Sequence, residues 1–255
     1  MKKYTSNKLV LRVLGILLFV ILWQVLSMAI GEDTFIFPSP MTTLTKTFEM
    51  LKHEYIYKCI GQTMLRMLIG FIVSFMIAFV LGVFAGNSET FEQLLKPTMT
   101  ILKSLPTATL VYLFLVVVGA RITPLMIVVL VSFPILYESI VGGIKATPMH
   151  LLEVSSLDGA SFLATNLEVR IPLAKPYIYV GIASSFALAL KIEIMAEVIT
   201  GYTRLGLGSA ILAAQRSDPT NMVPVFAYSF VTIVIILIVD SVSEIIKTNN
   251  SKKHL

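Results

Sequence analysis

Residues 147–161 read TPMHLLEVSSLDGAS, a polar stretch in an otherwise strongly apolar chain. Pro148 suits the first turn of a helix, and Gly159 can adopt the positive φ that ends one. Ser161 can cap a second helix that continues to about Val169. The stretch therefore predicts two short helices joined at a glycine, which form a compact projection.

Long apolar runs lie on both sides of this projection. The chain has 255 residues, of which 56% are hydrophobic and 14% charged, and its mean hydropathy is +0.86. Soluble domains have about 45–50% apolar and about 25% charged residues, so a soluble enzyme, a disordered chain and a fibrous protein are excluded. A membrane-spanning helix needs about 20 apolar residues, and six runs meet this length: 9–30, 62–86, 98–119, 123–143, 174–199 and 221–246.

These runs predict an all-α integral membrane protein with six transmembrane helices. We expect a single domain, 1–255, with its core at about 58–246 and the projection inside the polar loop 144–173. The first run is longer than the 7–15 apolar residues of a signal peptide, so we expect it to be retained as a span.

Basic residues in the loops predict the orientation of the spans. With the N-terminus inside, eleven basic residues face the inside: Lys2, Lys3, Lys8, Arg12, Lys96, Lys145, Arg170, Lys175, Lys247, Lys252 and Lys253. Six face the outside: Lys46, Lys52, Lys58, Arg121, Arg204 and Arg216. Because basic loops stay in the cytoplasm, the bias predicts that both termini and the projection are cytoplasmic.

The outer segment 31–61 carries a helical pattern of its own. Leu44, Phe48, Leu51 and Tyr55 recur at spacings of three or four residues. This spacing predicts an amphipathic helix on the outer surface.

The sequence lacks the motifs of common catalytic sites. No G-x-x-x-x-G-K-[ST] is present, and the glycine-rich stretch 201–209 lacks the lysine that would reach a phosphate. Neither H-E-x-x-H nor G-x-S-x-G occurs, the three histidines are scattered, and Cys59 is the only cysteine. We therefore expect a non-catalytic chain that binds no cofactor or metal. The basic residues form no long cluster, so the net charge of +5 does not indicate nucleic-acid binding.

Several charged residues fall within or beside the spans. Because charge near the middle of a membrane is costly, such residues face protein or water. Lys191 and Glu193 are candidates for a translocation path, or alternatively for an ion pair between helices with Arg66 as the partner. We expect Glu197 at the outer interface, where its side chain reaches water. Glu138 is interfacial or lines the inner mouth of a path.

The polar loop resembles the cytoplasmic signature of permease subunits in binding-protein-dependent ABC importers. That signature is E-A-A-x-x-x-G, nine residues, then I-x-L-P. Here Glu153 is followed six positions later by Gly159, and Val169-Arg170-Ile171-Pro172 follows at the expected distance. The two alanines are replaced by Val154 and Ser155, a small departure from the pattern.

Six further stretches resemble the same family, in the family's order and across about residues 35–245. They are Phe37-Pro38-Ser39-Pro40, Thr63 to Phe71 (TMLRMLIGF), Leu105-Pro106, Phe133-Pro134-Ile135, Ala196-Glu197-Val198-Ile199 and Gly206-Leu207-Gly208. The resemblance is to the branch that takes up sulfonates, taurine, nitrate and pyrimidine-type thiamine precursors.

The resemblance implies a fold, a location and a set of partners. It implies a type I importer permease in a bacterial inner membrane, working as a homodimer with two ATPase subunits and an external solute-binding protein. ATP and Mg²⁺ would be held by the ATPase subunits alone. The projection would be the coupling helix that docks on an ATPase, through Glu153, Ser155, Asp158, Gly159, Ala160 and Pro172. A self-contained channel or secondary transporter is the alternative, and in that case the projection would be incidental.

Overall fold

The computed structural model describes residues 2–30, 36–201 and 205–252, and these parts of the chain contain helices and no strands. Arg204 and Lys253, used above for orientation, lie outside the described residues. In chain order the elements are α1 (Lys2–Ile30), α2 (Pro40–Met50), α3 (Glu54–Asn87), α4 (Glu89–Ser104), α5 (Thr107–Val118), α6 (Thr123–Lys145), α7 (Met149–Leu157), α8 (Phe162–Ala164), the π-helical turn η2 (Thr165–Arg170), α9 (Ile171–Thr200), α10 (Leu207–Ser217) and α11 (Val223–Lys252).

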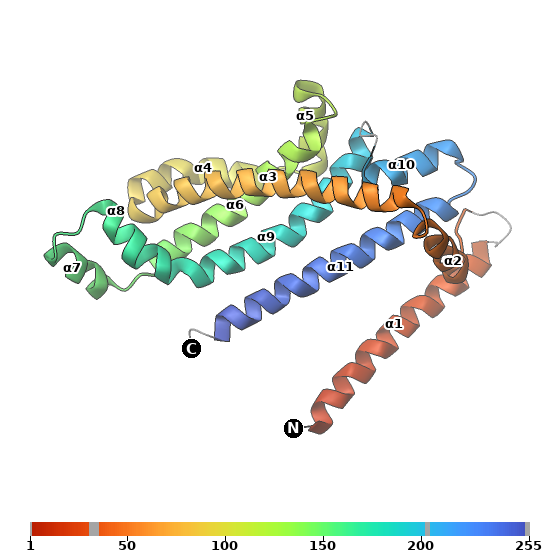
Figure 1. Cartoon of the computed structure of the whole chain (residues 1–255), viewed down its shortest axis with the longest axis horizontal. Helices are drawn as coiled ribbons and strands as arrows, with labels where there is room; N and C mark the ends of the chain where they lie inside the picture. The colour runs from red at the N-terminus through yellow and green to blue at the C-terminus, as the bar shows by residue number, and fades with distance from the viewer. Residues whose placement is uncertain (1, 31–35, 202–204, 253–255) are drawn as a thin grey trace.

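The core lies where α3, α6 and α9 pack against one another, and α11 lies along α9 (Figure 1). Lipid is as apolar as these side chains, so close packing of small residues, more than exclusion from water, holds such helices together. Gly82 and Gly86 of α3 face Ile140 and Ile144 of α6, and the isoleucine side chains occupy the space that a Cβ on either glycine would need. Helix α1 stands apart from this core, and only 6% of its apolar segment Val13–Ile30 is buried.

The predicted all-α membrane architecture is confirmed. Among the described residues, five helices are long and apolar enough to cross a membrane: α1, α3, α6, the continuous segment from α8 to α9, and α11. The third predicted run, 98–119, differs because it is not one straight helix. The structure divides it between α4 and α5, which meet at a bend of 99°, so the six spans are reached only if this pair counts as one.

The bend has a local cause at Pro106. Leu105 before it is extended, with φ −73° and ψ 129°, because a residue that precedes proline is disfavoured in the helical region. Pro106 also has no N–H to donate, so the helical hydrogen bonds are interrupted there. As a result α5 projects from the bundle at a steep angle to α4 (Figure 1).

The outer segment also differs from its prediction. Ser39 caps α2 by accepting a hydrogen bond from the Thr42 N–H, and α2 ends at Met50, so Tyr55 belongs to α3. The buried face of α2 includes Thr43 and Met50, whereas Phe48 of the predicted apolar face is 64% exposed. The periodicity located a helix here, and α2 packs against α11, but its buried face consists of Pro40, Thr43, Thr47 and Met50 and does not include Phe48.

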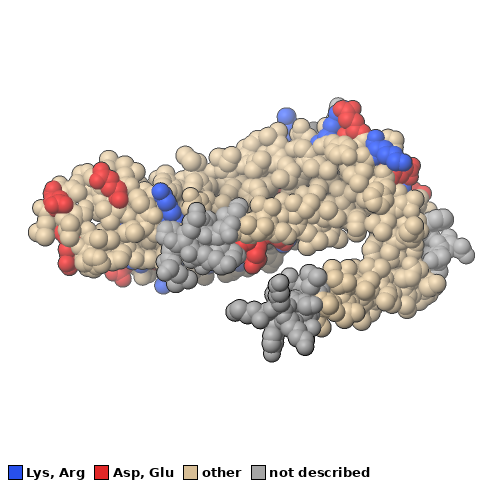
Figure 2. Space-filling model, turned by 60° about the horizontal axis from the view of Figure 1, so that its bottom comes forward, with Lys and Arg blue, Asp and Glu red and all other residues tan. Residues whose placement is uncertain are grey.

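The two ends of the molecule are chemically distinct from its middle. We call the end that carries α7 and α8 the loop end, and the end that carries α2 and α10 the α10 end. Figure 2 shows most charged side chains of the displayed face near these two ends, with a mostly uncharged surface between them. This distribution fits a bundle whose middle lies in lipid.

Candidate functional site

The projection at the loop end is built as the sequence predicts. Helix α7 begins directly after Pro148 and ends at Leu157, Asp158 is its C-cap, and Gly159 follows with φ +70°. The N–H groups of Gly159 and Ala160 donate to the carbonyls of Ser156 and Ser155, both at 3.1 Å. This pair of bonds is a Schellman motif, which needs a residue with positive φ and therefore favours glycine.

The second half of the projection follows at once. Ser161 caps α8 by accepting a hydrogen bond from the Ala164 N–H at 3.2 Å. The π-helical turn η2 then connects α8 to α9 without a break in the helical path. The projection is thus a direct extension of α9 beyond the bundle (Figure 1).

The outward surface of the projection is apolar. Leu157 at the tip is 86% exposed, and Met149, Val154, Phe162, Leu163 and Leu167 are also exposed. Glu153 and Asp158 are exposed among them. Exposed apolar residues gathered beside charged ones at the loop end are typical of a surface that another protein covers.

The residues predicted for coupling divide into two groups. Glu153, Asp158, Gly159 and Ala160 are exposed on the projection and can meet a partner. Ser155 is buried, and its hydroxyl shares a hydrogen bond of 2.9 Å with the Thr165 hydroxyl, so it holds α7 against η2. Pro172 is half-buried in the first turn of α9, where it shapes the start of that helix.

Contacts that the sequence did not reveal fasten the projection to α3. The Asn87 side-chain amide donates to the Asn166 side-chain oxygen at 2.8 Å, and Asn166 is buried. The Phe84 and Phe162 rings stack with 6.1 Å between centroids. These contacts join the projection to the end of α3.

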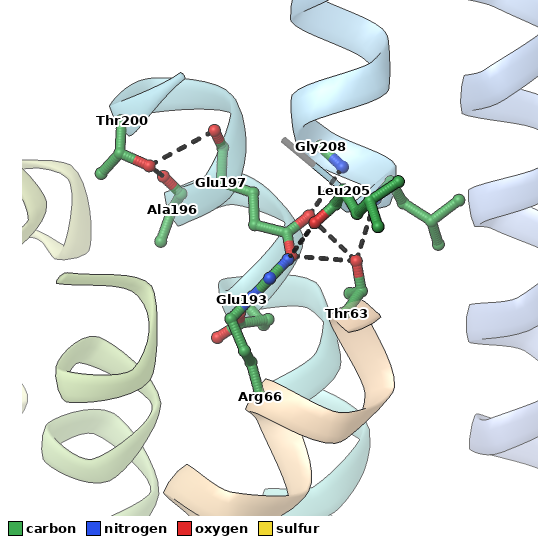
Figure 3. A network of polar contacts seen from close by, with 9 residues as sticks. Thr63, Arg66, Glu193, Ala196, Glu197, Thr200, Leu205 and Gly208 are labelled. Atoms are coloured by element: carbon green, nitrogen blue, oxygen red, sulfur yellow. Dashed lines mark hydrogen bonds and ion pairs between the residues drawn. The ribbon is translucent and has the colours of Figure 1, made fainter. Parts of the chain in front are cut away.

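A cluster of four polar side chains near the α10 end, which we call the clamp, joins α3 to α9. It consists of Thr63 and Arg66 from α3 with Glu193 and Glu197 from α9 (Figure 3). The Arg66 Nε donates to Glu193 at 3.2 Å, and its Nη2 donates to Glu197. Both glutamates are fully buried. The predicted ion pair of Glu193 with Arg66 is present.

Glu197 does not lie at an interface with water as expected. It accepts hydrogen bonds from the Thr63 hydroxyl at 2.9 and 3.0 Å and from the Gly208 N–H at 2.9 Å, in addition to Arg66. The expectation is wrong because the segment 205–208 folds over Glu197 and excludes water from it, an effect that depth along α9 does not include. A Cβ on Gly206 would lie 2.6 Å from the Glu197 carboxylate, so the glycine permits this close approach.

The clamp fixes the start of α10. Arg66 also donates to the Leu205 carbonyl at 2.9 Å, and the Leu207 N–H donates to the Thr63 hydroxyl at 2.9 Å. The first N–H groups of a helix have no partner within that helix, so Thr63 and Glu197 supply acceptors for two of them. The clamp therefore ties three helices together through one guanidinium and two carboxylates.

The other charged candidates are paired elsewhere. Lys191 binds Asp240 of α11 at 2.9 Å, and both side chains are partly exposed, 46% and 38% respectively. Glu138 of α6 binds Lys103 of α4 at 2.5 Å. Neither Asp240 nor Lys103 could be identified as the partner from the sequence, because each pair joins two different helices that are not adjacent in the chain.

Comparisons with known proteins agree with this architecture. Residues 78–251, more than half of the chain, match the model of the family described as binding-protein-dependent transport system inner membrane component, so the chain belongs to this family. The fold is that of type I ABC importer permeases. It is similar to a solved structure of the MetNI methionine ABC transporter in an inward-facing conformation, with a TM-score of 0.59, 16% identity and coverage of 78% of this chain and 99% of that chain.

Curated relatives point to the same class of protein. The chain is 27% identical to the riboflavin transport system permease protein RibX of Chloroflexus aurantiacus, over 82% of this chain and 77% of the relative. It is 24% identical to the putative aliphatic sulfonates transport permease protein SsuC of Bacillus subtilis, over 79% and 73%. It is 22% identical to the nitrate import permease protein NrtB of Synechocystis sp., over 84% and 79%. The protein is therefore a multi-pass permease subunit of an ABC importer.

Proposed function

We propose that this chain forms the translocation path for a small solute and that its α7–α8 projection docks on an ATPase subunit. The observation that carries the proposal is the exposed apolar tip around Leu157 on a rigidly fastened projection. In this proposal both termini and the projection face the cytoplasm, an external solute-binding protein delivers the solute, and two copies of the chain pair in the membrane.

The proposed coupling follows from the way the projection is attached. Closure of an ATPase around the projection would move α7, and the Ser155–Thr165 hydrogen bond would pass this movement to η2 and α9. The Asn87–Asn166 contact would pass it to α3. ATP hydrolysis would then take place entirely on the partner, with this chain as the moving part.

The proposed solutes are sulfonate-, taurine- or nitrate-like anions and pyrimidine-type thiamine precursors. Relatives named for aliphatic sulfonates and nitrate support an anion, and the relative named for riboflavin supports a heterocycle. Lys191 is the charged candidate best placed for the path, since it is half-exposed on α9, whereas Glu193 is buried in the clamp. A self-contained channel would have no use for the apolar tip.

The test is co-purification of partners with the tagged full-length chain from mild detergent, followed by mass spectrometry. We expect an ATPase subunit with the wild type and with Leu157→Met, which keeps an apolar side chain at the tip. We expect Leu157→Asp to lose the ATPase while still eluting as a single folded species, because Leu157 is almost fully exposed and contributes little to the fold.

Two outcomes would refute the docking proposal. One is an ATPase that co-purifies equally with Leu157→Asp. The other is a wild-type chain that purifies alone under conditions in which a known importer stays intact. An identified solute-binding protein, tested for thermal stabilisation by taurine, nitrate and aminopyrimidines, would decide between the proposed solutes.

A further inference from the structure

A cavity with a volume of about 340 Å³ opens between α4 and α6 toward the loop end. Its charged lining comes from Glu92 and Lys96 of α4 and from Glu138 and Lys145 of α6. Residues four apart on a helix share a face. Glu92 and Lys96 therefore lie on one face of α4, and Tyr137, Val141 and Lys145 lie on one face of α6. The cavity is therefore a polar groove between two otherwise apolar helices.

Both carboxylates of the groove already have cationic partners. Glu138 accepts from the Lys103 ammonium at 2.5 and 2.6 Å, and Glu92 forms an ion pair with Lys145. These two pairs connect α4 and α6 at two positions along the helices. A cationic ligand would have to displace a lysine from either carboxylate.

Two hydrogen-bond donors of the groove are not engaged by the residues that the structure describes. Tyr137 is only 3% exposed, yet its buried hydroxyl has no hydrogen-bond partner there. The Lys96 ammonium takes part in none of the ion pairs or side-chain hydrogen bonds formed within the described ranges. A buried hydroxyl without a partner is unfavourable, and a ligand in the groove would satisfy it.

We propose that this groove binds an oxyanion, with the Lys96 ammonium and the Tyr137 hydroxyl as its donors. The open donors select a ligand rich in acceptor oxygens, and the ammonium adds a charge-assisted bond. A sulfonate and a phosphate ester share this chemistry. The ligand is thus either a small oxyanion from solution or the phosphate of an anionic lipid headgroup.

The net charge of the groove agrees with this choice. The lining carries Lys96, Lys145, Glu92 and Glu138; Lys145 neutralises Glu92, and Lys103, which lies outside the lining, neutralises Glu138. The excess of one positive charge lies on Lys96, the lysine without a carboxylate partner. Of the three charged residues that the sequence singled out for a translocation path, only Glu138 lies at this cavity.

The experiment measures binding of two probes to the purified full-length chain. The soluble probe is methanesulfonate, titrated against chloride at constant ionic strength and followed by thermal stability in detergent. The lipid probe is phosphatidylglycerol, compared with phosphatidylcholine in nanodiscs and followed by native mass spectrometry of retained lipid. The variants are Lys96→Gln and Tyr137→Phe, and the matched controls are the exposed pair Lys175→Gln and Tyr177→Phe of α9.

We expect Lys96→Gln and Tyr137→Phe each to weaken binding of one probe about tenfold or more, which is the size of a lost hydrogen bond to a charged group. The two controls should bind like the wild type. Tyr137→Phe should keep its thermal stability without probe, because the hydroxyl it removes has no partner. This separates lost binding from misfolding.

The probe that responds identifies the source of the oxyanion. Variant-sensitive binding of methanesulfonate assigns the groove to a soluble oxyanion, and variant-sensitive retention of phosphatidylglycerol assigns it to a lipid headgroup. Binding of neither probe, or binding that both variants leave unchanged, would overturn the proposal. The readout needs no ATPase or solute-binding protein, so its result is independent of the docking test above.

Discussion

The two glutamates of the clamp lie one helical turn apart on α9, and the structure predicts opposite consequences for the same substitution. Glu197→Gln is expected to destabilise the protein, whereas Glu193→Gln is expected to be nearly neutral. Both are fully buried and both contact Arg66, so burial alone does not distinguish them. The difference lies in how many donors each carboxylate serves.

The magnitudes follow from the hydrogen bonds of each side chain. Glu197 accepts from Thr63, Arg66 and the Gly208 N–H, so a glutamine would turn an amide N–H₂ toward a donor and lose at least one charge-assisted bond, about 1.5–3 kcal/mol. Glu193 accepts from Arg66 at 3.2 Å, and its second oxygen has no partner among the described residues. Its substitution loses that one bond but removes the excess negative charge of the clamp, so we expect a net change within about 1 kcal/mol.

The assay is the thermal unfolding midpoint of the purified chain in a mild detergent. At roughly 2–4 °C per kcal/mol for a protein of this size, Glu197→Gln should lower the midpoint by about 3–12 °C. Glu193→Gln should stay within about 4 °C of the wild type. The exposed Glu168→Gln serves as the control for loss of a glutamate elsewhere.

Equal losses for the two clamp variants would refute this reasoning, because they would show that both carboxylates are equally engaged. A larger fall in the thermal midpoint for Glu193→Gln than for Glu197→Gln would also refute it. That result would mean that the second oxygen of Glu193 has a hydrogen-bond partner outside the described contacts. The single variant Arg66→Met offers a second measurement. Removing the guanidinium alone leaves two buried carboxylates and should cost about 3–5 kcal/mol.

Three further predictions concern the projection, the core and the candidate path. Gly159→Asn should keep coupling of ATP hydrolysis to uptake in proteoliposomes better than Gly159→Val, because asparagine tolerates the φ of +70° and a β-branched residue does not; equal activities would contradict this. Gly86→Ala should lower the thermal midpoint, because its Cβ would lie 2.6 Å from Ile144 and overpacking costs about 1–3 kcal/mol, whereas Gly142→Ala meets nothing within 4 Å and should raise it. With the buried Cys59 replaced by serine, Lys191→Cys should react with a water-soluble thiol reagent and Glu193→Cys should not; similar labelling of both would refute exposure of Lys191 to a water-filled path.

Features that depend on a few consecutive residues were accessible from the sequence. The projection is an example, because Gly159 and Ser161 act on the backbone within one turn of themselves. Apolar length likewise predicted α6, α9 and α11 to within a few residues, since a membrane imposes that length on any helix that crosses it. Pro106 interrupts the helical hydrogen bonds of run 98–119 locally, whereas the angle of 99° between α4 and α5 is a property of the tertiary structure.

Pairings between distant residues were mostly inaccessible. The Arg66–Glu193 pair was anticipated as one alternative, because few charges in the spans were available to form it. The partners of Lys191 and Glu138 were not anticipated, and Glu197 was expected in water. Each of these depends on which faces of two helices meet, and a rotation of a helix by one residue would change the partner.

The sequence by itself determined that this protein spans a membrane, where it turns, and that it carries a projection of short helices joined at Gly159. These properties follow from hydrophobic length and from local backbone preferences, which are properties of short segments. Only the tertiary structure decided that Glu197 is buried under the start of α10, that Ser155 faces inward, and that Tyr137 and Lys96 share a groove. Those facts arise from the packing of helices far apart in the chain, which fixes distances that no local pattern encodes.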